Sequence, residues 1–211
     1  MKVTELLHDV HNYSASLDSR EIFLHNYYGG SSDDENPGVE YKMSNIFLKN
    51  LRSMQLKSHD PITIHMHSIG GEWADGMAMY DAISMSKCYI TIIAYGQVES
   101  MSSIIYQAAD ARWITPNAHF MVHYGSTDAA GEYQSVQNWV KYEKHICDTM
   151  LDIYAQSCIG GKFFKEKYNT NDPQVSKVKN FLVTKLKSGD WYMTAAESVD
   201  YGFADRIITQ W

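Results

Sequence analysis

The sequence predicts an α/β fold with a mostly parallel sheet and flanking helices. Two short runs, at residues 62–66 and 88–95, are rich in apolar and β-branched residues and have the length of strands. Each run is followed by a segment whose apolar residues recur at helical spacing, and strands that alternate with helices usually form parallel sheets. The second run is apolar along nearly its whole length, which is typical of a strand buried on both faces.

The bulk composition is that of one globular domain. The chain has 211 residues, of which 45% are hydrophobic and 20% are charged, and this size is enough to bury a substantial core. We see no internal repeat and no linker, so we expect a flexible polar segment at residues 1–19 and a single domain at residues 20–211. The net charge of −7 and the lack of a basic stretch argue against a nucleic-acid partner.

Targeting and redox features point to the cytoplasm. The N-terminal stretch MKVTELLHDVHN mixes charges of both signs without the apolar core of a signal peptide, and no apolar run is long enough to cross a bilayer. The cysteines at 88, 147 and 158 are an odd number without metal-site spacing. We therefore expect a cytoplasmic protein with reduced cysteines, no membrane partner, no bound metal and no cofactor.

The first half of the chain alternates strands and helices. Residues 21–24 should form a strand, and a loop rich in Gly, Ser and Asp follows at 29–38. The strand at 62–66 leads into SIGG, which opens a helix over 73–83, and Gly96 should end the strand at 88–95 before a helix at 100–110. Another helix is expected between the first two strands, where apolar residues recur at Val39, Met43, Ile46, Phe47, Leu51 and Met54.

The second half contains two more strands, at 112–115 and 119–123, before one long helix at 131–157. At 1.5 Å per residue that helix would span roughly 40 Å, more than the core of this domain requires, so it is a candidate for contacts between subunits. A loop around 171–173 and a further helix follow. Thr194 and Glu197 then form a capping box for a short helix that ends at Gly202, and a last strand is expected at 204–208.

Ser100 stands where the buried strand gives way to a helix. Its hydroxyl would lie beside the unpaired amide groups of the first helical turn, where the helix dipole favours negative charge. That position suits a nucleophile, although a serine at a helix start is also a common N-cap. Gly70 and Gly71 follow the strand at 62–66, and their amides could hold an oxyanion or simply form a turn.

His123 and Asp190 could complete a catalytic set with this serine. A neutral histidine can accept the serine proton and return it to a leaving amine, and a carboxylate can hold the imidazole in the required tautomer. Taken singly, one of nine histidines is more often structural, and Asp190 could be a solvated turn residue.

Four segments in a fixed order give these residues a common interpretation: SIGG at 68–71, YGQVESMSS at 95–103, TPNAHFMVHYGS at 115–126 and DWYMTAAESVDYGFADRI at 190–207. The sequence resembles the proteolytic subunit of Clp protease. In that family the corresponding segments read SPGG, GQAASM, PNxxxMIHQP and a stretch similar to FLSAEEAVEYGLVD. The resemblance runs from the first expected strand to the C-terminus and is strongest over 62–123 and 190–207.

The resemblance implies a serine peptidase with a crotonase-like spiral fold. Ser100 matches the family's nucleophile, His123 its general base and Asp190 its acid, while Gly71 and Met101 match the positions whose backbone N–H groups form the oxyanion hole. The stretch from Gly125 through Tyr154 corresponds to the family's handle, which joins two rings and carries substrate-binding backbone. The family's subunits form heptameric rings stacked in pairs and cleave unfolded chains or peptides inside the chamber, so a homo-oligomer is expected here.

Two departures from the family pattern concern the catalytic set. Glu99 stands directly before the nucleophile, where the family has a small residue, and a carboxylate there would oppose an alkoxide unless its side chain points away. The segment at 160–189 is longer than its counterpart in the family. That length leaves Asp172 as the rival to Asp190 for the position of the acid.

A third departure concerns partners. Thr63 and His65 occupy positions where the family carries aromatic residues that receive the docking loop of an AAA+ unfoldase, so dependence on such an ATPase stays open. A virus-encoded member of the family that works without an ATPase would show this kind of departure. His65 and His67 share a strand face and could bind a metal, but two imidazoles without a third ligand are more often polar surface.

The leading hypothesis is a serine endopeptidase that hydrolyses peptide bonds through an acyl-enzyme on Ser100. A ring-forming subunit of the same fold that has lost its activity is one alternative. A crotonase-type acyl-CoA hydratase or isomerase is another, since it shares the fold and the oxyanion hole. That second class needs no serine nucleophile, so the presence of Ser100, His123 and Asp190 favours the peptidase.

Overall fold

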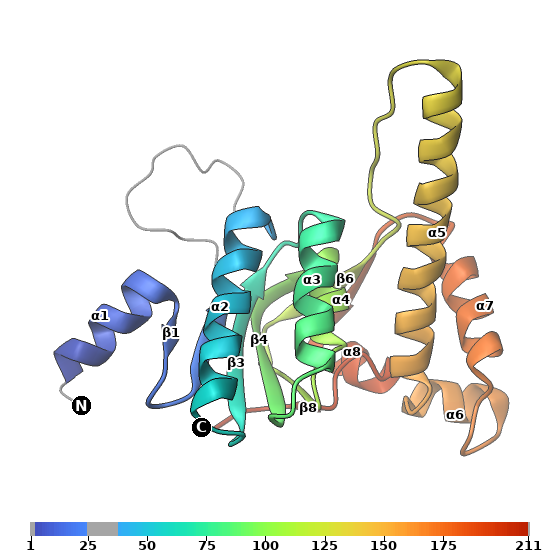
Figure 1. The fold of residues 1–211 in the computed structure, drawn as a ribbon. Coiled ribbons are helices and arrows are strands. Elements are labelled where there is room, and N and C mark those ends of the chain that lie inside the picture. Colours follow the sequence, from blue (N-terminus) through green and yellow to red (C-terminus); the bar gives the residue numbers. More distant parts are fainter. Residues whose placement is uncertain (1–2, 25–37, 211) are drawn as a thin grey trace.

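The computed structural model describes residues 3–24 and 38–210 (Figure 1). The loop expected at 29–38 lies outside these residues except for Gly38. Within them the chain forms an α/β fold, as the sequence predicts, with a sheet at its centre and helices packed around it (Figure 1).

The sheet has eight strands, and most neighbouring strands are parallel. Six strands follow the order β1-β2-β3-β4-β5-β8, while β6 pairs with the end of β4 and β7 pairs antiparallel with β6. The strands are β1 (Ala15–Ser16), β2 (Glu21–Leu24), β3 (Ile62–Ser68), β4 (Ile90–Glu99), β5 (Ala111–Ile114), β6 (His119–Val122), β7 (Trp191–Thr194) and β8 (Arg206–Ile207).

Helices pack on the sheet and beside it. Helices α2 and α3 contact each other in front of the sheet in Figure 1, and α5 packs against α7 to the right of the sheet in that view. The helices are α1 (Val3–Tyr13), α2 (Tyr41–Lys57), α3 (Trp73–Ser84), α4 (Met101–Tyr106), α5 (Tyr133–Cys158), α6 (Lys162–Tyr168), α7 (Val175–Leu186) and α8 (Ala195–Tyr201).

One continuous hydrophobic core joins the strands to these helices. Each fully buried aromatic side chain removes about 150–250 Å² from water, so aromatic residues dominate the packing energy. The largest of them come from strands and helices far apart in the sequence, namely Phe47, Tyr106, Phe120, Tyr154, Phe164 and Phe203.

Strand β4 differs from the prediction because Gly96 bends it without ending it. Residues 91–94 of β4 pair with β5, whereas residues 97–99 pair with β6, so the strand changes partner at the bend. Gly96 has φ of +53°, and a Cβ there would lie 2.8 Å from the His67 ring nitrogen Nε2, so both the backbone conformation and the space favour glycine. The consequence is that β4 carries the chain on to Glu99 and delivers Ser100 directly at its end.

Helix α4 is shorter than the predicted helix at 100–110 and ends at Tyr106. After that residue the chain turns back to the sheet, where a carboxylate oxygen of Asp110 accepts a hydrogen bond of 2.7 Å from the Ile90 amide. The Asp110 amide also donates to the Ile90 carbonyl over 2.9 Å, so this residue joins the segment after α4 to the start of β4.

Four elements were not predicted: α1 and β1 within the N-terminal segment, α6 before the turn at 171–173, and β7 directly after Asp190. Elements β7 and α6 are short and carry little periodic pattern, whereas α1 has apolar residues at helical spacing, Val3, Leu6, Leu7 and Val10, but buries none of its residues. Val39, which was expected in the predicted helix between the first two strands, lies before α2 and forms a bridge with Gly71.

Helix α5 projects well beyond the sheet (Figure 1). It has 26 residues, and its buried residues, Met150, Leu151, Tyr154, Ala155 and Cys158, all lie in its C-terminal half. The N-terminal half therefore has little contact with the rest of its own chain. None of the helices in the described parts of the chain is long and apolar enough to span a membrane.

Candidate active site

Ser100 is the N-cap of α4 and holds an uncommon backbone conformation, with φ of 52° and ψ of −127°. A residue other than glycine with positive φ is strained, and such strain persists where the surrounding structure enforces it. Here the Ser100 amide donates to the Met121 carbonyl over 3.1 Å, and the Ser103 amide donates to the Ser100 carbonyl over 3.0 Å. These bonds fix the turn that presents the Ser100 hydroxyl.

Buried hydroxyl groups reinforce this turn. The Ser103 hydroxyl donates to the Ser100 carbonyl over 2.6 Å and also lies 2.6 Å from the Tyr154 hydroxyl on α5. Burial raises the pKa of Tyr154 well above its usual value, so its hydroxyl stays neutral and available for hydrogen bonding. The turn is thereby tied to the buried half of α5.

His123 lies against the Ser100 hydroxyl, with 2.7 Å between His123 Nε2 and Ser100 Oγ. On the other side of the ring, His123 Nδ1 lies 3.3 Å from a carboxylate oxygen of Asp190. A histidine protonated on Nδ1 can donate to Asp190 and accept from Ser100 at the same time. The three residues therefore form a continuous chain of polar contacts.

The pairing of β6 with β7 explains why His123 and Asp190 meet. The two strands are antiparallel and Val122 pairs with Trp191, so the residues just outside this pair stand opposite each other. Those residues are His123 and Asp190. The rival acid, Asp172, lies in the turn between α6 and α7, where its amide donates to the Thr170 hydroxyl over 3.2 Å.

The glycine turn after β3 packs directly against Ser100. A Cβ on Gly70, which has φ of +94°, would lie 2.6 Å from Ser100 Cβ and 2.8 Å from the Met101 nitrogen. The turn is held by Ser68, whose hydroxyl accepts from the Gly70 amide over 3.3 Å and from the Ser102 hydroxyl over 2.7 Å. Only glycine permits so close an approach of two backbone segments.

Two backbone N–H groups at this contact have no acceptor among the described residues. Those of Gly71 and Met101 donate no hydrogen bond there, while the flanking Glu72 amide bonds to the Val39 carbonyl. The Met101 group belongs to the first turn of α4, where amides have no partner inside the helix. Gly71, Ser100, Met101 and His123 line the same cavity, so both N–H groups belong to residues that border the serine hydroxyl.

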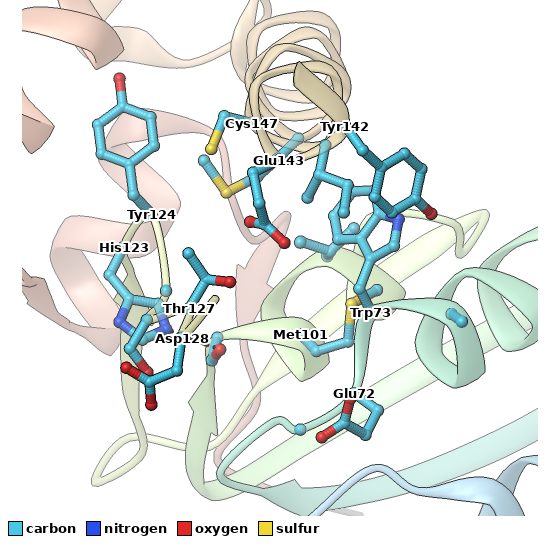
Figure 2. Close-up of a pocket in the computed structure, with 18 of the residues that line it drawn as sticks. Glu72, Trp73, Met101, His123, Tyr124, Thr127, Asp128, Tyr142, Glu143 and Cys147 are labelled. Atoms are coloured by element: carbon cyan, nitrogen blue, oxygen red, sulfur yellow. Dashed lines mark hydrogen bonds between the residues drawn. The ribbon is translucent and has the colours of Figure 1, made fainter. Parts of the chain in front are cut away.

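A cavity of about 510 Å³ opens beside Ser100 and His123 (Figure 2). Its walls come from the start of α3, the first turns of α4, the segment at 124–128 and the projecting helix α5. A cavity of this size accepts a side chain with part of the adjoining backbone. The residues that line it include Trp73, Ile104, Tyr124, Trp139, Tyr142, Glu143, Ile146, Cys147 and Met150.

Glu99 points away from the nucleophile. Its carboxylate lies 2.6 Å from His119 Nε2 on β6 and is largely buried, whereas the neighbouring Ser100 hydroxyl contacts His123. The His119 ring also packs against Tyr192, with 6.3 Å between the ring centroids. The Glu99 side chain, which departs from the family pattern, is therefore paired with His119 and not directed at the Ser100 hydroxyl.

The paired histidines on β3 do not form a metal cluster in the described residues, where no group of three or more His, Cys, Asp or Glu side chains is placed to hold a metal. His65 is buried instead among polar and aromatic side chains. Its Nδ1 lies 2.9 Å from the Tyr95 hydroxyl and its Nε2 lies 3.3 Å from a Glu21 carboxylate oxygen. Its ring also stacks on Phe23, with 4.6 Å between the ring centroids.

Sequence reasoning missed the residues that line the cavity from α3 and α5. One signal was available for α5: its cavity residues recur at spacings of three and four, on a helix longer than the core requires. No signal in the sequence alone could assign that stripe to a cavity, because the helix had first to be placed against Ser100.

Comparisons with known proteins agree with this architecture. The chain matches the Clp protease family over residues 10–211. It is 28% identical over 177 residues to the ATP-dependent Clp protease proteolytic subunit of Deinococcus radiodurans, covering 82% of this chain and 77% of that protein. A solved structure of a ClpP1 mutant from Listeria monocytogenes has the same fold, with a TM-score of 0.69 and 22% identity, covering 92% of this chain and 94% of that one. Since the family match extends over nearly the whole length, this chain belongs to the Clp protease family.

Proposed function

We propose that this chain is a serine endopeptidase that cleaves peptide bonds through an acyl-enzyme on Ser100. The observation that carries the proposal is the continuous contact from Ser100 Oγ to His123 Nε2, and from His123 Nδ1 to Asp190. This constellation is recognised by its geometry and by the roles of its members rather than by their order in the chain.

In the first step, Ser100 Oγ attacks the carbonyl carbon of the peptide bond while His123 Nε2 takes its proton. The Gly71 and Met101 N–H groups would hold the oxygen that becomes negative, which is the role of an oxyanion hole. The tetrahedral intermediate then breaks the C–N bond, and His123 returns the proton to the leaving amine. The acyl group remains as an ester on Ser100.

In the second step, water takes the place of the amine. His123 removes a proton from the water, which attacks the ester carbonyl, and the same proton is returned to Ser100 Oγ as the new carboxyl group leaves. Asp190 acts throughout by holding the His123 ring in the correct tautomer and by stabilising it when it is protonated.

The proposed substrates are unfolded chains or peptides, cleaved inside a chamber built by an oligomer of this chain. Membership of the Clp protease family supports this part of the proposal, with stacked heptameric rings as the expected form. The projecting half of α5, which has little contact with its own chain, is the element that would join subunits. The proposal does not include an AAA+ unfoldase, because the buried His65 side chain contacts Tyr95 and Glu21.

A fluorophosphonate probe tests this proposal because it reacts with serines that are activated as nucleophiles. Wild-type protein should be labelled once per chain at Ser100, located by peptide mass mapping, and should hydrolyse short fluorogenic peptides. Ser100→Ala should lose the label and lower turnover by about a thousandfold or more. Ser135→Ala, which removes an exposed serine from α5, is the matched control and should keep both. Absence of labelling in correctly folded wild-type protein would instead favour an inactive subunit of the same fold.

A further inference from the structure

One face of α5 forms a wall of the cavity beside Ser100. The residues of this face recur at spacings of three and four along the helix, so their side chains lie above one another on the same side. They are Trp139, Tyr142, Glu143, Ile146, Cys147 and Met150. Glu143 is the only charged member of this wall.

The Glu143 carboxylate faces the cavity without a cationic partner. Figure 2 shows Glu143 projecting from α5 into the cavity, above Met101. The residue is half-buried, and no Lys, Arg or His in the described parts of the chain forms an ion pair with it. The pKa of the Cys147 thiol, one turn further along the same wall, is raised. Burial is the largest cause, and the negative charge of the nearby Glu143 carboxylate is the next.

The rest of the cavity surface is complementary to a long cationic side chain. Apolar groups of Met101, Ile104 and Ile146 line the cavity and can pack against methylene groups. Trp73 and Tyr142 provide aromatic rings, which attract cations. Glu72 and Asp128 add two further carboxylates, and neither lysine nor arginine is present among the residues that line the cavity.

The position of this carboxylate relative to the reacting atoms selects one side of the peptide bond. His123 must face the leaving amine, whereas the Gly71 and Met101 N–H groups must face the oxygen of the acyl group. Glu143 lines the same cavity as Ser100 and Met101, so we assign it to the residue whose carbonyl carbon is attacked.

We propose that Glu143 makes this cavity select peptides with lysine or arginine as the residue on the acyl side of the scissile bond. The inference rests on the proposed peptidase function and specifies its substrate. A basic side chain would place its cation on the Glu143 carboxylate and its methylene groups on the apolar wall. An uncharged side chain would displace water from the Glu143 carboxylate and offer it no hydrogen-bond donor in return. The loss of these hydrogen bonds disfavours binding of such a peptide.

Matched tripeptide substrates that release aminomethylcoumarin test this selection, because the coumarin occupies the leaving-group side and only the acyl residue varies. The acyl residue would be lysine, arginine or norleucine, whose uncharged chain resembles that of lysine. We expect kcat/KM for the lysine peptide to exceed that for the norleucine peptide on the order of tenfold. A hydrogen bond between charged groups stabilises a complex by enough to change its binding constant about tenfold. Glu143→Gln should reduce the ratio to about twofold or less.

Glu132→Gln is the matched control. It removes the same charge from the residue that precedes α5 and does not line the cavity, so it should keep the wild-type ratio. Binding of the same peptides to Ser100→Ala, measured by competition with a fluorescent lysine peptide, gives a second readout that needs no turnover. It should show the same preference for lysine and the same loss of that preference when Glu143→Gln is added.

The outcomes separate this inference from the proposed function. One result would overturn the selection by Glu143 but not the peptidase function: Ser100 is labelled and all peptides are cleaved without a preference for lysine. The same conclusion would follow if Glu143→Gln kept the wild-type preference for lysine. Failure of both labelling and cleavage, together with no binding of any peptide to Ser100→Ala, would overturn both proposals. A lysine preference that disappears only in Glu143→Gln supports the inference.

Discussion

Asp190 meets His123 because two strands that are distant in sequence pair in a defined register. Val122 pairs with Trp191, and the following positions must then face each other across the end of the β6–β7 ladder. The contact is 3.3 Å between His123 Nδ1 and the carboxylate, and the Asp190 side chain is about half exposed to solvent. At this site the backbone pairing, rather than burial, positions the proposed acid.

Asp190→Asn should lower kcat sharply, by about a thousandfold or more, and change KM little. An amide can hold the ring in the wrong tautomer, in which Nε2 carries the proton and cannot accept that of Ser100. Steady-state hydrolysis of a fluorogenic peptide measures both constants. Asp172→Asn is the control because Asp172 lies in the turn between α6 and α7, and it should retain wild-type activity. The reverse result would assign the acid to Asp172.

The sequence identified the members of the candidate triad and favoured Asp190 as the acid through the segment that follows it, but it left Asp172 as a rival. Ser100 and His123 lie in segments that resemble one family, and the structure brings both residues together with Asp190. The choice against Asp172 required the β6–β7 register, and β7 itself is only four residues long. Glu143 was missed because a glutamate on an exposed helix is ordinary until the helix is known to face a cavity.

Elements were predicted best where their pattern is strong and local. The strand at 21–24 and the long helix were expected almost as the structure has them, because apolar runs and helical periodicity depend on neighbouring residues. Gly96 was misread as a strand end, since in sequence a glycine that bends a strand looks the same as one that ends it. Helix α1 was missed because the N-terminal segment was interpreted as polar and flexible, although Val3, Leu6, Leu7 and Val10 recur at helical spacing.

The capping box at the start of α8 is expected to stabilise the fold by an amount that depends on pH. The Thr194 hydroxyl accepts from the Glu197 amide over 3.2 Å, and the Glu197 carboxylate accepts from the Thr194 amide over 2.8 Å. The hydrogen bond from that amide, and then the one from the Thr194 hydroxyl, lower the pKa of Glu197. A carboxyl group with a lowered pKa in the folded state contributes stability above its unfolded pKa, and the contribution is lost as the pH falls through the folded value.

Thr194→Ala should therefore lower the free energy of unfolding by about 1 kcal/mol at neutral pH, and by less near pH 3. Urea unfolding followed by circular dichroism at both pH values measures the difference. Thr184→Ala is the matched control, since Thr184 is an exposed residue within α7 whose hydroxyl bonds only to the preceding helical turn. A loss of equal size in Thr184→Ala, or one that grows at low pH, would contradict the capping argument.

At the scale of the whole molecule, half of α5 stands clear of the rest of the fold. The N-terminal half of α5 extends beyond the sheet, yet it supplies part of the cavity wall next to Ser100 (Figure 1). Apolar side chains on this half are exposed to solvent in the single chain, namely Tyr133, Trp139, Val140 and Tyr142. A site with one wall on an unsupported helix would be held more firmly if another subunit packed against that helix.

The whole chain should consequently form a large closed oligomer at micromolar concentration, with this half of α5 in the contact between subunits. Val140 is 59% exposed and does not line the cavity, so it reports on assembly without altering the proposed catalytic groups. Val140→Asp would bury an unpaired charge in such a contact and should shift the protein to a smaller species in light scattering, with lower peptidase activity. Val140→Thr keeps the side-chain shape and should remain assembled. If the wild-type chain is monomeric under these conditions and still cleaves peptides, the proposed chamber is wrong while the chemistry at Ser100 stands. If Val140→Asp assembles like wild type, subunits meet through another surface.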